Sequence, residues 1–461
     1  MGMKYSDFYA MVCDKAEEIP QLPAFRMEKN GRVEEVSYSA FKDAVDGRAL
    51  ELEKYREEGY LCAAVVCTGT YLSVLDIFSA ARAGFQLVLM DQSLSDEELE
   101  ELEKATDVSI LLEDGEIEIR EKTEVPENSE KDVLFFTSGT TSHSKAVVLT
   151  QESLCASAWN GSALLPLKEK DTLMCMLPLN HVFGFVCAMM WALTNGASVA
   201  LGRGMRHYAD DCALFHPTVV SVVPMLLNFL LKNNCLNSEL KLVLIGAGDC
   251  PKKLINEAKE RGLRVSFGYG LTETSSGVAL SLGEDPYLLS VCPDFEVRAG
   301  ADGEILVSNN SCMMKGYYRA PEDTNEVLRD GVLYTGDLGI VNGNKIRILG
   351  RKKEIVVLLD GTKIYIPEYE KALAARLPGR DFAVVGIEGR PVLFVYNPRK
   401  ELDNGLDAVC IGRAIEGFMM KLPRGQQISR IQVVNERLPR TATGKIKRWE
   451  LERENGKNVQ K

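Results

Sequence analysis

Long apolar runs are missing from this sequence. No stretch approaches the roughly 20 consecutive apolar residues that a membrane-spanning helix needs. Residues 1–20 (MGMKYSDFYAMVCDKAEEIP) also lack the apolar core of a secretory signal. The Met-Gly start with Ser6 resembles a myristoylation site, but no basic cluster supports anchoring. We therefore expect a cytoplasmic protein without a stable membrane anchor.

An excess of basic residues is missing as well, and so are paired cysteines. The 54 Lys and Arg against 66 Asp and Glu give a net charge of −12, which disfavours nucleic acid as the main partner. The 12 cysteines are scattered, and no two have the CxxC spacing of zinc or redox motifs. Most lie within apolar runs, as Cys67, Cys175 and Cys187 do. We interpret them as buried free thiols of a reducing compartment.

Short apolar segments dominate the chain from Ala63 to Phe267. They alternate with amphipathic segments of helical length, such as 97–105 and 251–262. Strands that are apolar on both faces and alternate with helices indicate parallel sheets covered on each side. We predict strands at 63–67, 86–90, 133–136, 172–177, 197–201, 218–223, 241–246 and 264–267.

The pattern changes after Leu280. Short alternating segments separated by Gly, Asp and Asn predict a small antiparallel sheet or barrel over about 281–350. After the polar GRKKE segment (350–354), a helix, two strands and a long helix predict a separate α+β block. We therefore expect an α/β fold in which a large N-terminal domain (1–350) of layered, mostly parallel sheets, with helices and a small β-subdomain, is joined by a hinge to a smaller mobile α+β domain (351–461).

The segment VLFFTSGTTSHSKAVVLTQESL (133–154) is the strongest chemical signal. An apolar strand leads into a loop of Gly, Ser and Thr that carries Lys145, and a helix is predicted from about Gln151. Small residues let backbone N–H groups approach an anion, hydroxyls donate hydrogen bonds, and the lysine supplies charge. The spacing is not that of a Walker loop. We interpret the segment as a phosphate-binding loop; a Ser/Thr-rich surface loop is the alternative.

A second segment, SFGYGLTETSSG (266–277), carries an aromatic ring, a hydroxyl and a carboxylate. Tyr269 lies between two glycines, which leave its ring free to stack on a flat ligand. Thr272 is a candidate phosphate contact and Glu273 a candidate Mg²⁺ ligand, because Mg²⁺ in nucleotide sites takes one or two carboxylates plus phosphate oxygens. A Tyr-Gly turn with a solvated glutamate is the alternative.

Three charged residues in later segments are further candidates. Asp337 in LYTGDLG (333–339) is expected in a tight turn, where its carboxylate can bind ribose hydroxyls or stabilise the turn itself. Arg351 in GRKKE can pair with phosphate or sugar, and Lys445 follows a glycine at a predicted helix start in LPRTATGKIKRWEL (438–451). Each of the last two has a solvated surface charge as its alternative.

Taken in order, these segments resemble those of one superfamily. TSGTT…K, YGxTE, TGD, GRxK and PRTxTGKxxR follow one another as in the adenylate-forming enzymes, which include AMP-forming acyl-CoA synthetases, nonribosomal-peptide adenylation domains and luciferases. The likeness covers roughly residues 130–450 and extends to LPLNHVFGF (177–185), LIGAGDCP (244–251) and MKGYYRAPEDT (314–324).

The resemblance implies a site for ATP and Mg²⁺. The ATP-binding residues that it implies are Thr137, Ser138, Gly139, Thr140, Thr141, Lys145, Gly246, Ala247, Gly248, Tyr269, Gly270, Asp337 and Arg351. Among them, the Ser/Thr/Gly loop and Lys145 would surround the phosphates, Tyr269 would lie along adenine, and Asp337 would bind ribose together with Arg351. Thr272 would contact the α-phosphate and Glu273 would hold Mg²⁺.

The resemblance also implies a moving C-terminal domain and an acyl pocket. Lys445 resembles the lysine that touches both the carboxylate and the α-phosphate, and Lys353 lies at the pivot about which that domain rotates. His181 falls beside the implied acyl pocket, with a packed core histidine as its alternative. Amino-acid-activating relatives carry an aspartate shortly after this position, whereas VFGFVCAMMW (182–191) contains no acid. An acyl or aryl acid without an α-amino group is therefore favoured.

The sequence departs from the family pattern in two places. Ser142, Ser144 and Ala146 replace Gly, Pro and Gly in the phosphate loop, and the loss of glycine conformational freedom can slow loop closure. After the hinge, Gly361 stands alone where many CoA-using relatives have two adjacent glycines. This second difference bears on how CoA is received.

We expect activation of an apolar carboxylic acid to acyl-AMP with release of pyrophosphate. The acyl group then passes to a thiol, with CoA as the favoured acceptor and the phosphopantetheine of an acyl carrier protein as the alternative. A catalytically silent nucleotide-binding protein is the third interpretation.

Overall fold

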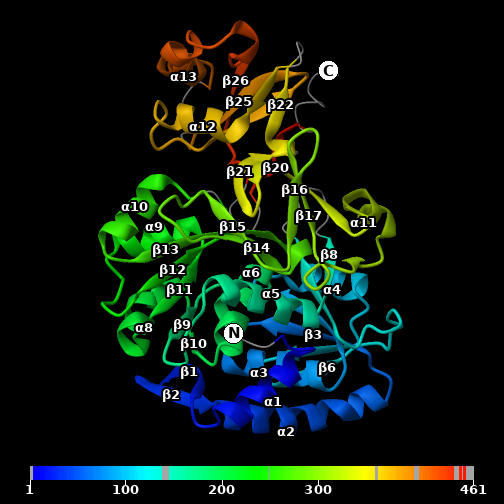
Figure 1. Cartoon of the computed structure of the whole chain (residues 1–461). Helices are drawn as coiled ribbons and strands as arrows, with labels where there is room; N and C mark the ends of the chain where they lie inside the picture. Colours follow the sequence, from blue (N-terminus) through cyan, green and yellow to red (C-terminus); the bar gives the residue numbers. More distant parts are fainter. Residues whose placement is uncertain are drawn as a thin grey trace.

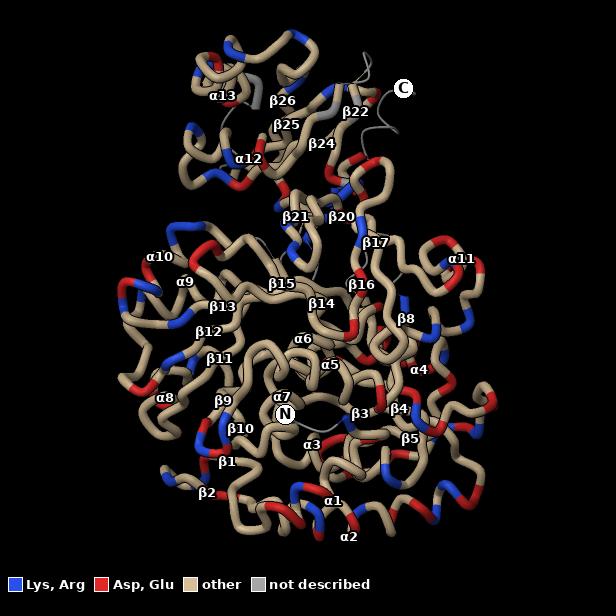
Figure 2. The backbone as a smooth tube through the Cα atoms, in the orientation of Figure 1, with Lys and Arg blue, Asp and Glu red and all other residues tan. Residues whose placement is uncertain are grey.

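The computed structural model describes residues 4–137, 145–248, 250–358, 362–398, 404–440, 446–448 and 450–452. Figure 1 shows a large lobe that carries the elements up to β21 and a small lobe above it that carries those from β22 onward. None of the described helices is both long enough and apolar enough to cross a bilayer. Figure 2 shows acidic and basic residues interspersed along the outer helices.

The first sheet of the large lobe has the order β18-β8-β7-β4-β3-β5-β6. Its centre is parallel, and β6, β8 and β18 are antiparallel additions. Residues of β3 face alternately into two apolar clusters, one shared with α1–α3 and one with α4, so both faces are covered. The strands are β3 (Cys62–Cys67), β4 (Gln86–Asp91), β5 (Ile110–Glu113), β6 (Glu116–Ile119), β7 (Asp132–Phe136), β8 (Ala146–Thr150) and β18 (Gly316–Tyr317).

Helices α1–α4 pack around this sheet. Helix α4 begins with a capping box in which Ser95 and Glu98 exchange hydrogen bonds, and its first turn is acidic, as the helix dipole favours. Phe8, Phe41 and Phe78 bring the apolar faces of α1, α2 and α3 together. The bounds are α1 (Phe8–Glu18), α2 (Tyr38–Glu57), α3 (Tyr71–Arg82) and α4 (Asp96–Ala105).

The second sheet is parallel from β1 through β10, β9, β11 and β12 to β13, and β2 pairs antiparallel with β1. Apolar residues of α8–α10 cover one face of it, and α5–α7 lie between the two sheets. Its strands are β1 (Pro23–Lys29), β2 (Arg32–Ser37), β9 (Thr172–Cys175), β10 (Ser198–Leu201), β11 (Val219–Val222), β12 (Leu242–Ile245) and β13 (Arg264–Leu271). Its helices are α5 (Gln151–Leu164), α6 (Val182–Phe185), the π-turn η1 (Val186–Met190), α7 (Trp191–Thr194), η2 (Met205–His207), α8 (Tyr208–Phe215), α9 (Pro224–Lys232) and α10 (Lys252–Glu260).

The antiparallel region continues this second sheet through β13. The order β13-β14-β15-β21-β20-β17-β16 is an open path, so the described strands form a sheet rather than a barrel. It begins at Ser276, earlier than the predicted change after Leu280, because β14 already pairs antiparallel with β13. The strands are β14 (Ser276–Ser281), β15 (Leu289–Val291), β16 (Glu296–Ala299), β17 (Glu304–Ser308), β19 (Leu328–Arg329), β20 (Val332–Asn342) and β21 (Lys345–Arg351), with helix α11 (Pro321–Val327) beside them.

The small lobe packs two helices on a three-stranded sheet. Ile366, Leu373, Ile411 and Ile415 of α12 and α13 meet β24 and β25 in one apolar cluster. The elements are η4 (Lys352–Glu354), β22 (Ile355–Val357), β23 (Lys363–Tyr365), α12 (Ile366–Ala374), β24 (Phe382–Ile387), β25 (Arg390–Tyr396), α13 (Asn404–Met419), η5 (Arg424–Gln426) and β26 (Arg430–Val434). The domain boundary at 350/351 remains a prediction.

Candidate active site

Three predicted ATP-binding residues meet on neighbouring strands. The Tyr269 hydroxyl of β13 donates to Asp337 Oδ2 of β20 at 2.9 Å, and Arg351 Nε of β21 lies 3.0 Å from Asp337 Oδ1. Asp337 and Arg351 are register partners in the β20–β21 ladder. Asp337 is only 3% exposed, so its charge is buried with two partners that satisfy it.

The strand around Asp337 corrects the expectation of a tight turn. LYTGDLG lies inside the 11-residue strand β20, which is irregular between Leu338 and Gly339. Gly336 adopts φ +70°, and its N–H donates to Glu304 Oε1 at 2.8 Å. The irregular strand thus turns the Asp337 carboxylate inward without ending the ladder.

Tyr269 is more enclosed than its glycine neighbours suggested. Its side chain belongs to the apolar cluster between β13, β14 and β17 and is 9% exposed. Burial, and then the negative charge of Asp337, raise the pKa of the Tyr269 phenol, so it stays a hydrogen-bond donor. Gly270 cannot be replaced here, because a Cβ would lie 1.6 Å from the Ser276 carbonyl oxygen. Stacking of Tyr269 on adenine remains a prediction.

Strands β7 and β8, which precede and follow the phosphate-loop residues in the sequence, pair antiparallel, and the sequence analysis did not predict this pairing. Thr137 N donates to the Lys145 carbonyl at 2.9 Å and closes the described part of the hairpin. Ser138, Gly139, Thr140 and Thr141 lie outside the described residues, as do the departures at Ser142 and Ser144. Lys145 Nζ lies 2.8 Å from Asp323 Oδ1 and 4.9 Å from the centroid of the Tyr317 ring.

Thr272 and Glu273 form the 3-10 turn η3 (Thr272–Thr274) between β13 and β14. The Glu273 carbonyl accepts from Met314 N at 2.9 Å, and its Oε1 accepts from the Tyr317 hydroxyl at 2.8 Å. Burial, and then Glu273, raise the pKa of Tyr317. Tyr317 therefore lies between Glu273 and Lys145.

The small residues at the end of β12 face an aromatic ring from α6. A Cβ on Gly246 would lie 2.7 Å from the Phe183 ring, so only glycine allows this packing. Ala247 follows with φ +60°, a conformation uncommon for a residue with a side chain. The pair Gly246–Ala247 thus has a defined and partly strained backbone, and its place beside adenine remains a prediction.

His181 is the N-cap residue of α6, and its side chain makes no capping hydrogen bond to the helix. Its neighbour Asn180 donates to Asp91 Oδ2 at the end of β4 at 3.2 Å. Burial lowers the pKa of His181, and the charge of Asp91 only partly opposes this shift. His181 is therefore neutral near pH 7, and its role at the acyl pocket stays a prediction.

The donor set fits a magnesium nucleotide. Among the described residues no three His, Cys, Asp or Glu side chains gather as a metal site would require. The Glu273 carboxylate uses one oxygen for Tyr317, which leaves the other for a cation whose remaining ligands come from phosphate. Burial alone would lower the pKa of the Arg351 guanidinium, but the surrounding negative charges, Asp337 first among them, outweigh burial and raise that pKa overall.

The C-terminal candidates are only partly described. Lys445 lies outside the described residues, although Arg440 and Ile446 on either side form an antiparallel bridge. Lys353 belongs to η4, and its place as the pivot remains a prediction. Its neighbour Lys352 lies 2.7 Å from Glu304 Oε2, so the segment at the predicted hinge is tied to the carboxylate that also binds Gly336.

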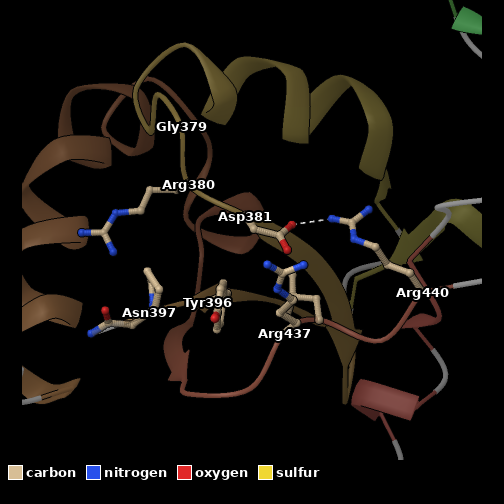
Figure 3. A pocket seen from close by; sticks show the side chains of 9 residues that line it. Gly379, Arg380, Asp381, Tyr396, Asn397, Arg437 and Arg440 are labelled. Atoms are coloured by element: carbon tan, nitrogen blue, oxygen red, sulfur yellow. Dashed lines mark hydrogen bonds and ion pairs between the residues drawn. The ribbon is translucent and has the colours of Figure 1, made fainter. Parts of the chain in front are cut away.

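A cavity of about 590 Å³ lies in the small lobe and contains none of the predicted site residues (Figure 3). Two of its arginines have acidic partners: Arg380 pairs with Asp407 at 2.8 Å, and Arg440 pairs with Asp381. The cavity therefore does not coincide with the large-lobe candidates Tyr269, Asp337, Arg351, Lys145 and Glu273.

The sequence analysis missed the roles of Tyr317 and Asp323. Both belong to MKGYYRAPEDT, which was noted as similar to the family but given no function. Pairing of β18 with β8 brings this segment against the end of the phosphate loop. Only that tertiary pairing identifies them, because the segment lies more than 160 residues after the loop.

Comparisons with known proteins agree with this geometry. Residues 113–318 match the family model described as AMP-binding enzyme. Nearly half of the chain thus resembles the AMP-binding enzyme family. Among curated relatives, it is 29% identical to a 2-succinylbenzoate–CoA ligase of Bacillus cytotoxicus over 69% of both chains, and 26% identical to one of Bacillus pumilus over 82% of this chain and 85% of that protein.

Solved structures extend the likeness beyond the AMP-binding domain. O-succinylbenzoate coenzyme A synthetase from Bacillus subtilis, in complex with AMP, superposes with a TM-score of 0.79 at 23% identity, covering 96% of this chain and 98% of that one. ATP-bound MatB from Rhodopseudomonas palustris gives 0.78 at 20% identity, with 98% and 99% covered. The predicted α/β fold class and the resemblance to adenylate-forming enzymes are confirmed.

Proposed function

We propose that this enzyme activates a carboxylic acid with ATP, releases pyrophosphate and transfers the acyl group to CoA. The observation that carries the proposal is the meeting of Tyr269, Asp337 and Arg351 on neighbouring strands. The contacts that Lys145 and Glu273 both make with Tyr317 support it. The AMP-binding domain and the relatives that are 2-succinylbenzoate–CoA ligases support the same reaction.

The chemistry explains the residue types. A carboxylate attacks the α-phosphorus of ATP, the new acyl–phosphate bond forms as the bond to pyrophosphate breaks, and a thiol then displaces AMP. The first step brings anions together, so preorganised positive charge lowers its barrier. Mg²⁺, when bound through Glu273, would neutralise phosphate charge. Lys145 and Lys445 would hold the triphosphate and the reacting carboxylate, and Asp337 with Arg351 would fix the ribose.

The acid is proposed to be an apolar acyl or aryl monocarboxylic acid. The segment 182–191 carries no charged side chain, and Val182, Gly184 and Phe185 within it are buried. A second charge on the acid would lose hydration without gaining a partner there, which costs several kcal/mol. The relatives are named for 2-succinylbenzoate, an aryl acid with two carboxylates, so it belongs in the first test panel as the dicarboxylic acid against which this proposal is tested.

Acid-dependent exchange of pyrophosphate into ATP tests the proposal. The panel contains fatty acids of increasing length, benzoates, 2-succinylbenzoate and amino acids at matched concentrations. We expect exchange with an uncharged-tail fatty or aryl acid, followed by thioester formation with CoA. Exchange only with amino acids would overturn the substrate class. If a thioester forms only on an acyl carrier protein, then the carrier protein, and not CoA, is the acceptor.

We also propose that the enzyme acts in the cytoplasm. The structure shows no disulfide between any of the 12 cysteines, all of which lie in its described part, and eight of them are buried. Disulfides form in oxidising compartments and are rare in the cytoplasm. Fractionation followed by thiol labelling under denaturing conditions tests this: labelling of all the thiols without prior reduction supports it.

A further inference from the structure

Tyr317 contacts both phosphate-side candidates of the site. Its hydroxyl donates to Glu273 Oε1 at 2.8 Å, and the ammonium of Lys145 lies 4.9 Å from the centre of its ring. The three residues come from β18, η3 and the end of the phosphate loop, which are distant in sequence. One side chain thus links the candidate metal carboxylate to the candidate phosphate lysine.

The backbone of Tyr317 is fixed from two directions. It is the register partner of Val147 in the β18–β8 pair, so its side chain is a diagonal neighbour of Lys145 on the same face. Its N–H donates to Thr324 Oγ1 at 2.9 Å at the start of α11. The ring therefore has a defined position at the mouth of the loop.

The neighbouring Tyr318 provides an internal comparison. Side chains alternate along a strand, so Tyr318 faces the other way, and its hydroxyl donates to Asp107 Oδ2 at 2.8 Å. Both tyrosines are partly buried and both donate to a carboxylate. They differ in that only the Tyr317 partner is a site candidate.

The contacts of Tyr317 suit an orienting role. A hydrogen bond to one oxygen of a carboxylate fixes its rotation and leaves the second oxygen directed elsewhere, and such partners of metal ligands tune metal affinity. An aromatic face attracts an ammonium without neutralising it, so Lys145 keeps its charge for phosphate. Asp323 also holds Lys145 in this structure, at 2.8 Å, and must release it when phosphate binds.

We propose that Tyr317 is a positioning residue that orients Glu273 toward Mg²⁺ and holds Lys145 beside the phosphates of ATP. The proposal rests on the function proposed above. It assigns a role to a residue that contacts neither the ribose-side group nor the acyl side.

The test compares Tyr317→Phe with Tyr318→Phe. The second variant is the control, because it also removes a tyrosine hydroxyl but from the neighbouring residue. We expect Tyr317→Phe to raise the Mg²⁺ concentration for half-maximal pyrophosphate exchange about tenfold, with most of the rate recovered at saturating Mg²⁺. Binding of Mn²⁺ in the presence of ATP, followed by electron paramagnetic resonance, should weaken by a similar factor. Tyr318→Phe should change neither quantity.

A double mutant separates orientation from general packing. If Tyr317 acts through Glu273, then Tyr317→Phe adds no further Mg²⁺ shift in a Glu273→Gln background. An additive shift, an unchanged Mg²⁺ response in Tyr317→Phe, or an equal shift in Tyr318→Phe would each overturn the proposal. Absence of exchange with every acid would instead count against the proposed function, and the Mn²⁺ measurement would still test Tyr317.

Discussion

The ribose side and the phosphate side of the candidate site are held in different ways. On the ribose side, Tyr269 and Asp337 are buried and joined to Arg351 across the strands of one sheet. On the phosphate side, Lys145 pairs with Asp323, whose side chain is 42% exposed. The first group lies within a rigid sheet, and the second lies at loop ends and short turns.

The ribose side of the candidate site is therefore preformed, whereas the phosphate side can change its contacts when ATP binds. The ribose-side partners satisfy one another without any ligand, so they contribute to folding as well as to binding. The Lys145–Asp323 pair is exposed and weak, and phosphate can replace it at little cost. Changes on the ribose side should therefore reduce stability, whereas changes on the phosphate side should reduce activity alone.

Lys445→Ala should give the largest effect, because it removes the C-terminal cation from the phosphate side. Loss of one preorganised donor typically costs about 10²–10³ in rate. We expect that loss in adenylate formation, with thioester formation from preformed acyl-adenylate spared. Lys447→Ala is the matched control, since Lys447 pairs with Glu450 at 3.2 Å. Equal losses in the two half-reactions would contradict domain rotation.

Asp337→Ala, on the ribose side, should reduce both the stability of the protein and its binding of ATP. It leaves the Tyr269 hydroxyl and Arg351 without their shared partner, which should cost about 2 kcal/mol of unfolding free energy and raise the KM for ATP. Urea denaturation measures the first effect. Asp285→Ala serves as the control, because it breaks the exposed pair with Arg347 on the same strand β21 and should cost well under about 1 kcal/mol. If the two substitutions destabilise the protein equally, then the ribose-side contacts contribute no more to folding than an exposed ion pair does.

Glu273→Gln should affect catalysis without affecting folding. Its carboxylate is partly buried and accepts one hydrogen bond from Tyr317, which the amide oxygen can still accept. We expect the Mg²⁺ concentration for half-maximal exchange to rise about tenfold, with the urea midpoint unchanged. An unchanged Mg²⁺ response and rate would remove Glu273 from the metal site.

Asp323→Asn should give the smallest effect. It frees Lys145 from its partly exposed ion pair, whose strength is of the order of 0.2–1 kcal/mol. The KM for ATP should then fall about twofold, with little change in kcat. A rise in KM would mean that Asp323 supports ATP binding rather than competing with it.

The sequence predicted the buried strands well. The predicted segments 63–67 and 86–90 match β3 and β4 to within one residue, because strands covered on both faces leave an unbroken apolar run. Strand β2, with exposed positions at Arg32, Val33 and Glu35, leaves no such run and was not predicted. The residues of strand β8 were assigned to the phosphate loop instead of to a strand.

The site was predicted in part. Asp337 and Arg351 were identified as ribose partners through the resemblance, and they are register partners in the structure. The turn expected at Asp337 was wrong, because an irregular strand with a left-handed glycine accomplishes the same change of direction. Tyr317 depends on the β18–β8 pairing, which is a long-range contact that no local pattern encodes.

The nucleotide product of the acid- and CoA-dependent reaction tests the central claim most directly. Chromatography of a reaction with ATP, Mg²⁺, CoA and the preferred acid should show AMP and pyrophosphate formed in equal amounts with the thioester. Omission of CoA should leave acyl-AMP detectable by mass spectrometry. Formation of ADP and orthophosphate in step with the thioester would contradict the account, because it would require activation through an acyl phosphate instead of an adenylate.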